Sequence, residues 1–163
     1  MNFTDILLPE FDHEMSNTRK TLERIPESRF SWRPHDKSYT LGTLAAHIAN
    51  LPSFVTVALG QDSFDLGMYP SPAPMKTRKD VLAAFDSNVK AARTAISCAT
   101  NEVLMRPWAL LHGTATVFTI PKVTVLRSFV MNHLIHHRAQ LSVYLRLNNI
   151  PVPALYGPSA DEQ

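Results

Sequence analysis

Two histidines, His133 and His137, stand four residues apart in a stretch of helical periodicity. Residues with this spacing project from the same face of a helix, about one turn from each other. Two imidazoles on adjacent turns can bind one metal ion, as they do in helical zinc motifs. The chain has seven histidines in 163 residues, and random placement would give roughly 0.3 such pairs. The spacing alone is therefore weak evidence, and the surrounding residues must decide.

The surrounding residues place the pair on a helix face that should meet the core. A three-four alternation runs through Val123, Leu126, Val130, His133, His137, Gln140 and Tyr144. Such an alternation is typical of a buried helix face. A third histidine, His47, lies among Leu44, Leu51 and Phe54 on another predicted helix. Buried polar groups are unfavourable without partners, and one metal ion would satisfy all three imidazoles. Each histidine could instead be a hydrogen-bonded core residue.

Three nitrogen ligands leave at least one coordination position open for water or substrate, which is the pattern of catalytic rather than structural zinc sites. A metal in such a site can lower the pKa of bound water to about 7 or hold a thiol as the thiolate. Imidazole ligands suit several divalent transition metals. We expect zinc or nickel, with iron or manganese as alternatives.

Several polar residues near the predicted site are candidates for supporting roles. Glu14 occupies a core-facing position, where it could accept a hydrogen bond from a ligand histidine or from water on the metal. Alternatively, Met15 faces inward and Glu14 is solvated. Gln140 and Tyr144 could line the cavity beside the metal, or could be structural. His136 and Arg138 fall off the helix face; we interpret His136 as a surface residue, and Arg138 could pair with a carboxylate or a partner chain.

The elements that must position these residues are four predicted helices in an all-α, four-helix bundle. They cover Phe3–Arg24, Ser38 or Thr40 to just before Gly60, Thr77–Cys98 and Pro121–Leu147. The first helix should bury Leu7, Phe11, Glu14, Thr18, Leu22 and Ile25. Pro52 predicts a bend one turn after His47, and Thr77 with Asp80 resembles a capping box.

The connections between the helices contain the glycine and proline residues that interrupt helices. The linker Gln61–Lys76 contains Gly67, Pro70, Pro72 and Pro74 and is expected to be a long surface crossover. From Thr100 to Ile120 the helical pattern lapses, which predicts two short extended pieces or an irregular turn. The tail after Asn148–Asn149 should pack back on the bundle through Val152, Leu155 and Tyr156.

The composition fits one domain over residues 1–163, with 45% apolar and 18% charged residues. The net charge of +2 and scattered basic residues argue against nucleic acid. The chain has a single cysteine, Cys98, which fits a reducing compartment. No signal peptide and no apolar run of about 18 residues are apparent. We therefore expect a cytoplasmic protein without membrane or nucleic-acid partners.

Longer stretches resemble a known family. NHLIHHRAQLSVYLRLNNIPVPALYGPSADE is similar to the C-terminal signature of the DinB/YfiT family of metalloenzymes, and LGTLAAHIANLP is similar to its second-helix motif. FDHEMSNTRKTLERIP and WRPHDKS extend the resemblance over nearly the whole chain. The resemblance implies a four-helix bundle, commonly a homodimer, with a metal site on His47, His133 and His137. The family name refers to damage-inducible expression and does not imply DNA binding.

The resemblance also suggests chemistry, because some relatives are metal-dependent transferases or isomerases that act with low-molecular-weight thiols such as bacillithiol or mycothiol. Our leading hypothesis is an enzyme whose metal activates a thiol cosubstrate toward an electrophilic small molecule. A close variant activates water for hydrolysis. The alternative is a non-enzymatic, metal-binding stress or interaction protein whose site stabilises the bundle.

Overall fold

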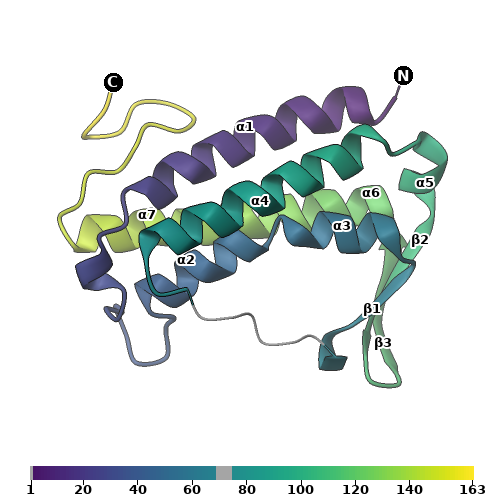
Figure 1. Cartoon of the computed structure of the whole chain (residues 1–163), viewed down its shortest axis with the longest axis horizontal. Helices are drawn as coiled ribbons and strands as arrows, with labels where there is room; N and C mark the ends of the chain where they lie inside the picture. Colours follow the sequence, from purple (N-terminus) through teal and green to yellow (C-terminus); the bar gives the residue numbers. More distant parts are fainter. Residues whose placement is uncertain (1, 69–74) are drawn as a thin grey trace.

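The computed structural model describes residues 2–68 and 75–163, and these form a helical bundle with a small sheet at one end (Figure 1). The first three helical segments are α1 (Thr4–Glu23), α2 (Leu41–Asn50) continued by α3 (Ser53–Gly60), and α4 (Arg78–Ser97). The last consists of α6 (Lys122–Thr124), the π-helical η3 (Val125–Asn132) and α7 (His133–Leu147). Shorter pieces are η1 (Glu27–Arg29), η2 (Leu66–Met68) and α5 (Asn101–Met105). Pro70, Pro72 and Pro74 of the predicted linker lie outside the described residues.

The long helices α1 and α4 follow the predicted pattern. All six residues assigned to the inner face of the first helix are buried: Leu7, Phe11, Glu14, Thr18, Leu22 and Ile25. Pro9 lies inside α1. Helix α4 begins at the predicted capping box, in which the Thr77 hydroxyl accepts from the Asp80 backbone N–H at 3.1 Å and the Asp80 carboxylate accepts from the Thr77 N–H. These contacts satisfy backbone donors that the first turn leaves unpaired.

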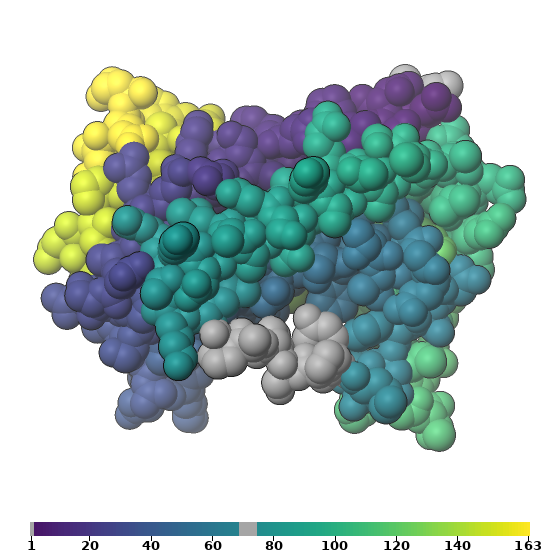
Figure 2. Space-filling model, in the orientation of Figure 1, coloured from purple at the N-terminus to yellow at the C-terminus, as the bar shows by residue number. Residues whose placement is uncertain are grey.

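The connection between α3 and α4 is a crossover, as predicted. Figure 1 shows α2–α3 and α4 running in the same direction, whereas α1 and α7 run the opposite way. The start of α4 therefore lies at the opposite end of the bundle from the end of α3. The twenty residues of α4 extend about 30 Å, so no tight turn could make this connection. On the face in Figure 2, α4 crosses between α1 and α2–α3, with which it packs.

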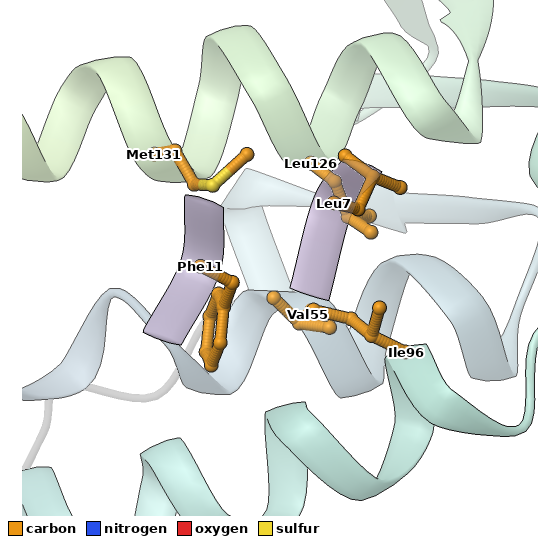
Figure 3. Close-up of a pocket in the computed structure, with 6 residues that line it drawn as sticks. All are labelled: Leu7, Phe11, Val55, Ile96, Leu126 and Met131. Atoms are coloured by element: carbon orange, nitrogen blue, oxygen red, sulfur yellow. The ribbon is translucent and has the colours of Figure 1, made fainter. Parts of the chain in front are cut away.

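The core is closely packed. Side chains from α1, α3, α4 and η3 converge between the helices (Figure 3): Leu7, Phe11, Val55, Ile96, Leu126 and Met131. The space among them has no room for a water molecule. Closely packed interiors resist deformation, so these contacts fix the four helical segments relative to one another.

The expectation of an all-α fold is wrong in one respect, because the chain contains a three-stranded sheet in the order β1-β2-β3. The predicted extended pieces are confirmed as a hairpin of β2 (Pro107–His112) and β3 (Ala115–Pro121), turning at Gly113 with a φ of 60°. Strand β1 (Ser63–Asp65) adds to β2 in parallel. It lies in the stretch predicted to be linker, where three residues are too few to show an alternation.

The helix predicted to end before Gly60 is broken at Pro52, where a bend was expected. The combined Leu41–Gly60 stretch is long and apolar enough to cross a membrane by length and composition. Core helices pass the same test, and 56% of its most apolar window is buried in the bundle. Because α2 and α3 both pack against α4, we interpret the stretch as a core element.

In the last helical segment, the buried face differs from the predicted one. In the π-helical stretch each turn takes about one residue more than an α-helical turn. The buried residues therefore continue through Leu126, Val130, Leu134, Arg138, Leu141 and Leu145. His133 and His137 lie half-buried beside this line, and Gln140 is exposed. The expectation that Arg138 falls off the buried face is wrong, since its exposure is 1%.

Candidate metal centre

The structure brings together the three histidines that the sequence selected. His47 from α2 meets His133 and His137 from α7, and one ligand nitrogen of each lies within 4.8 Å of the others. The Nε2 atoms of His133 and His137 are 2.9 Å apart, and those of His47 and His133 are 3.4 Å apart. We call these residues the three-histidine cluster. Helices α2 and α7 pack against each other, which is why residues 86 positions apart meet.

Two rings of the cluster are oriented through their second nitrogen. His137 Nδ1 lies 2.7 Å from Gln140 Oε1. Because a carboxamide oxygen can only accept, His137 Nδ1 carries the proton. The Gln140 nitrogen lies 3.1 Å from His136 Nε2, which agrees with this assignment of the amide. His133 hydrogen-bonds to the backbone of Phe129, and the bond favours the protonated ring, so the His133 ring is the donor.

Electrostatics keep the three rings neutral. Burial, together with the smaller effects of the neighbouring His137 and His133, lowers the pKa of His47 to about 4. Burial also lowers the pKa of His133 and of His137, each against an opposing hydrogen bond. A neutral imidazole has one N–H and one lone pair. In His137 the proton is on Nδ1, so the lone pair is on Nε2. The His133 Nε2 atom lies within hydrogen-bond distance of both other Nε2 atoms, and its role there depends on the His133 tautomer.

The Nε2 atoms of His133 and His137 meet at 2.9 Å. With His133 protonated on Nε2 this contact is a hydrogen bond, and with His133 protonated on Nδ1 both lone pairs are available to one cation. A zinc ion with Zn–N bonds of 2.0–2.1 Å in tetrahedral geometry places its nitrogens about 3.4 Å apart. The two observed Nε2 separations lie close to that spacing. Ligand histidines characteristically donate their other N–H to a neighbouring oxygen, as His137 does here. The donor set thus fits a divalent transition metal.

Glu14 does not have the role proposed for it, nor is it solvated. Its exposure is 6%, and its carboxylate pairs with Arg138 at 2.7 Å. It also accepts from the Tyr156 hydroxyl at 2.7 and 2.9 Å. Met15 is buried as well, so both residues face inward. No contact joins Glu14 to the cluster in the described part of the chain. Arg138 thus pairs with a carboxylate, one of the two roles considered for it.

Gln140 and Tyr144, the other two candidates, have separate positions. Gln140 is hydrogen-bonded directly to His137 of the cluster. It therefore makes the contact with a histidine that was expected of Glu14. Tyr144 is buried; its hydroxyl donates to the Tyr39 backbone oxygen at 3.3 Å, and its ring packs edge-on against Trp32 at 5.5 Å. His136 is exposed, as expected.

Sequence reasoning missed two neighbours of the cluster. The Tyr39 ring lies 6.0 Å from that of His47 and 6.5 Å from that of His137. The Phe129 ring lies 6.0 Å from that of His133. Phe129 precedes His133 by four residues, so the helical spacing could have identified it. Tyr39 belongs to a loop before α2, and no periodic pattern reaches a loop.

The fold and the cluster define a helical-bundle protein whose three gathered histidines are compatible with metal binding. The model of the DinB superfamily matches residues 10–141, so the chain belongs to the DinB superfamily. No curated protein matches the chain significantly.

Solved structures share the fold. A DinB-like protein from Bacillus cereus is 22% identical with a TM-score of 0.73, over 95% of this chain and 98% of the other. A DinB-like protein from Bacillus subtilis is 16% identical with a TM-score of 0.70, over 96% and 98%. A DinB family member from Exiguobacterium sibiricum is 18% identical with a TM-score of 0.64, over 91% and 94%. Identities this low show the common fold alone.

Proposed function

We propose that the three-histidine cluster binds one divalent transition metal, zinc or nickel, and that the protein is a metal-dependent enzyme acting on a small molecule. The observation that carries the proposal is the gathering of three neutral imidazoles, with the Nε2 atom of His133 2.9 Å from that of His137 and 3.4 Å from that of His47. A divalent metal held there would lower the pKa of a bound thiol or water. The reaction class is transfer or isomerisation with a low-molecular-weight thiol, or hydrolysis.

The residues of the chain prepare the site in three ways. Gln140 and the backbone of Phe129 hold two rings with their lone pairs directed inward. Burial keeps the rings unprotonated near neutral pH, so few protons compete with the metal. Three ligands from the protein leave a position for substrate. The apolar core between α1, α3, α4 and η3 (Figure 3) supports a catalytic over a structural ion, because apolar contacts join these helical segments.

Metal binding is tested first, by equilibrium dialysis of the full chain against zinc and against nickel. We expect one ion per chain. His47→Ala and His133→Ala should each lower the affinity by at least a hundredfold, since two imidazoles bind far less tightly than three. His112→Ala is the matched control, because His112 is exposed at the hairpin and outside the cluster. An unchanged affinity in both cluster variants would refute the site.

Activity is tested on the zinc-loaded and nickel-loaded chain with a simple thiol and a panel of electrophiles, and with a panel of esters. Turnover that disappears in His47→Ala but persists in His112→Ala would support the enzyme. Metal binding without turnover of any thiol or ester would instead favour the non-enzymatic alternative. The homodimer and the cytoplasmic location expected from the sequence remain predictions; light scattering on the purified chain would test the dimer.

A further inference from the structure

A cavity of about 260 Å³ lies directly against the three-histidine cluster. Its walls come from α2, α3, η2 and the last helical segment: His47, Asn50, Leu51, Phe54, Leu66, Phe129 and His133. Two of the three candidate ligands thus form part of its wall. A molecule inside the cavity would be held next to the metal centre without displacing any helix.

The lining is apolar and uncharged. Apart from the two imidazoles and Asn50, the described residues that line the cavity are aliphatic or aromatic. Phe54 and Phe129 meet edge to face with ring centroids 5.7 Å apart. In the metal-free chain, a charged group that entered would meet no charged side chain among the described lining residues, so the loss of its hydration would be uncompensated. A flat ring would meet two aromatic side chains in the orientations that such rings prefer.

The aromatic wall is itself supported by the sheet. Phe129 packs against Phe118 of β3 at 6.0 Å and against Trp108 of β2 at 6.4 Å, and Phe54 packs against Phe64 of β1 at 5.5 Å. Each strand of the small sheet therefore contributes an aromatic residue behind the cavity. This gives the sheet beside α3 and α6 in Figure 1 a role in shaping the site.

Asn50 supplies one polar anchor. Its amide nitrogen donates to the backbone oxygen of Ala46 at 3.0 Å, which fixes the side chain on α2. Within residues 2–68 and 75–163, nothing donates to its side-chain oxygen. That oxygen can accept one hydrogen bond from a ligand N–H or O–H.

We propose that this cavity binds an uncharged ring-bearing group of the substrate, aromatic or alicyclic, with one hydrogen-bond donor directed at Asn50. The proposal rests on the proposed function in that the metal centre is where this group would react. It assigns the cavity to the electrophile, and it places the charged parts of a thiol cosubstrate outside.

The test titrates the full-length, metal-free chain with three probes that share one ring, followed by NMR: benzamide, benzoate and benzylamine. We expect saturable benzamide binding that shifts the imidazole signals of His47 and His133. Benzoate and benzylamine should bind at least tenfold more weakly because they carry a charge. No benzamide binding, or equal affinities for all three probes, would overturn the proposal.

Variants locate the binding. Leu66→Trp fills the cavity and should weaken benzamide at least tenfold, whereas Met68→Trp, in the same short turn but outside the lining, should not. Asn50→Leu should also weaken benzamide binding. If Leu66→Trp were misfolded, Asn50→Leu would show whether benzamide binds in the cavity. Equal loss in Leu66→Trp and Met68→Trp, or full affinity in Asn50→Leu, contradicts the assignment. Zinc dialysis on the same samples separates the two proposals. If the chain binds zinc but not benzamide, the cavity proposal is refuted and the metal site is not.

Discussion

His133 and His137 bring their Nε2 atoms to 2.9 Å from each other, and the Nδ1 atom of His137 is hydrogen-bonded to Gln140. The spacing of four residues and the third histidine could be read from the sequence, since both depend only on helical periodicity. The partner of His137 was not identified: Gln140 was considered only as a residue that lines the cavity or is structural, and Glu14 was considered as the acceptor. Whether Glu14 reaches the histidines depends on the rotation of α1 against α7. That rotation is set by contacts across the whole bundle, which no local pattern contains.

The Gln140 carboxamide should matter for metal affinity because it fixes the tautomer of His137. We predict that Gln140→Leu weakens zinc binding by about 10- to 100-fold, the usual effect of removing such a partner. Gln140→Glu keeps an acceptor at the same place and should retain the wild-type affinity or exceed it. Competition titration with a chromophoric chelator measures both. If Gln140→Leu bound zinc as tightly as the wild type, the orienting role would be lost.

The metal-free protein should lose stability in mild acid. The folded pKa of His47 is about 4, below the unfolded value of about 6.5. Between these values the unfolded chain binds more protons, so the free energy of unfolding falls as the pH drops from about 6.5 toward 4. Urea denaturation at several pH values measures this loss. His47→Gln should show a smaller loss over the same range, and an equal loss would contradict the assignment.

At the scale of elements, the amphipathic helices were predicted well and the last segment was not. The inner face of α1 was correct at every residue because one regular period runs through it. In the last segment the π-helical turns of η3 change the period, so an alternation fitted to α-helical turns drifts off the core. The histidines were still found, because their mutual spacing lies within α7 and is unaffected by the drift.

The tail after α7 is tied to the bundle through Tyr156, whose hydroxyl is hydrogen-bonded to both partners of the buried Arg138–Glu14 ion pair. Arg138 also donates to the backbone oxygen of Glu14 at 3.0 Å and lies beneath the ring of Tyr156 at 5.3 Å. Val152 packs on the core, and Asp161 pairs with Arg146, so the predicted return of the tail is confirmed. The cluster of charges thus joins α1, α7 and the tail.

Removing one partner of the Arg138–Glu14 ion pair should strongly destabilise the fold. We predict that Arg138→Met destabilises the fold by about 3–5 kcal/mol, because it leaves a buried carboxylate unpaired. Glu14→Gln should also destabilise it, and the double variant should cost less than the two single changes added together. Urea denaturation measures the stabilities. Zinc affinity should remain within about twofold in Glu14→Gln, and a larger change would restore the second role first considered for Glu14.

At the scale of the whole molecule, the bundle, its crossover and the two extended pieces of the hairpin followed from the sequence, whereas the addition of β1 to the hairpin did not. Strand β1 is short and gains its stability from β2, more than forty residues later. Asp65 holds this junction by accepting from Gly67 N–H at 2.8 Å and from Gly113 N–H at 3.0 Å. Such pairing depends on long-range contacts, which leave little trace in a three-residue segment.

The bundle should fold without metal, because its apolar core is complete beneath the three-histidine cluster. We predict a cooperative thermal transition for the chelator-treated chain and a rise in Tm with added zinc. Binding only to the folded state stabilises it by about 2.7 kcal/mol at a free zinc concentration 100 times Kd. His47→Ala should melt close to the metal-free wild type and respond to zinc far less. Loss of cooperative folding on chelation would instead identify a structural ion and remove the main physical argument for catalysis.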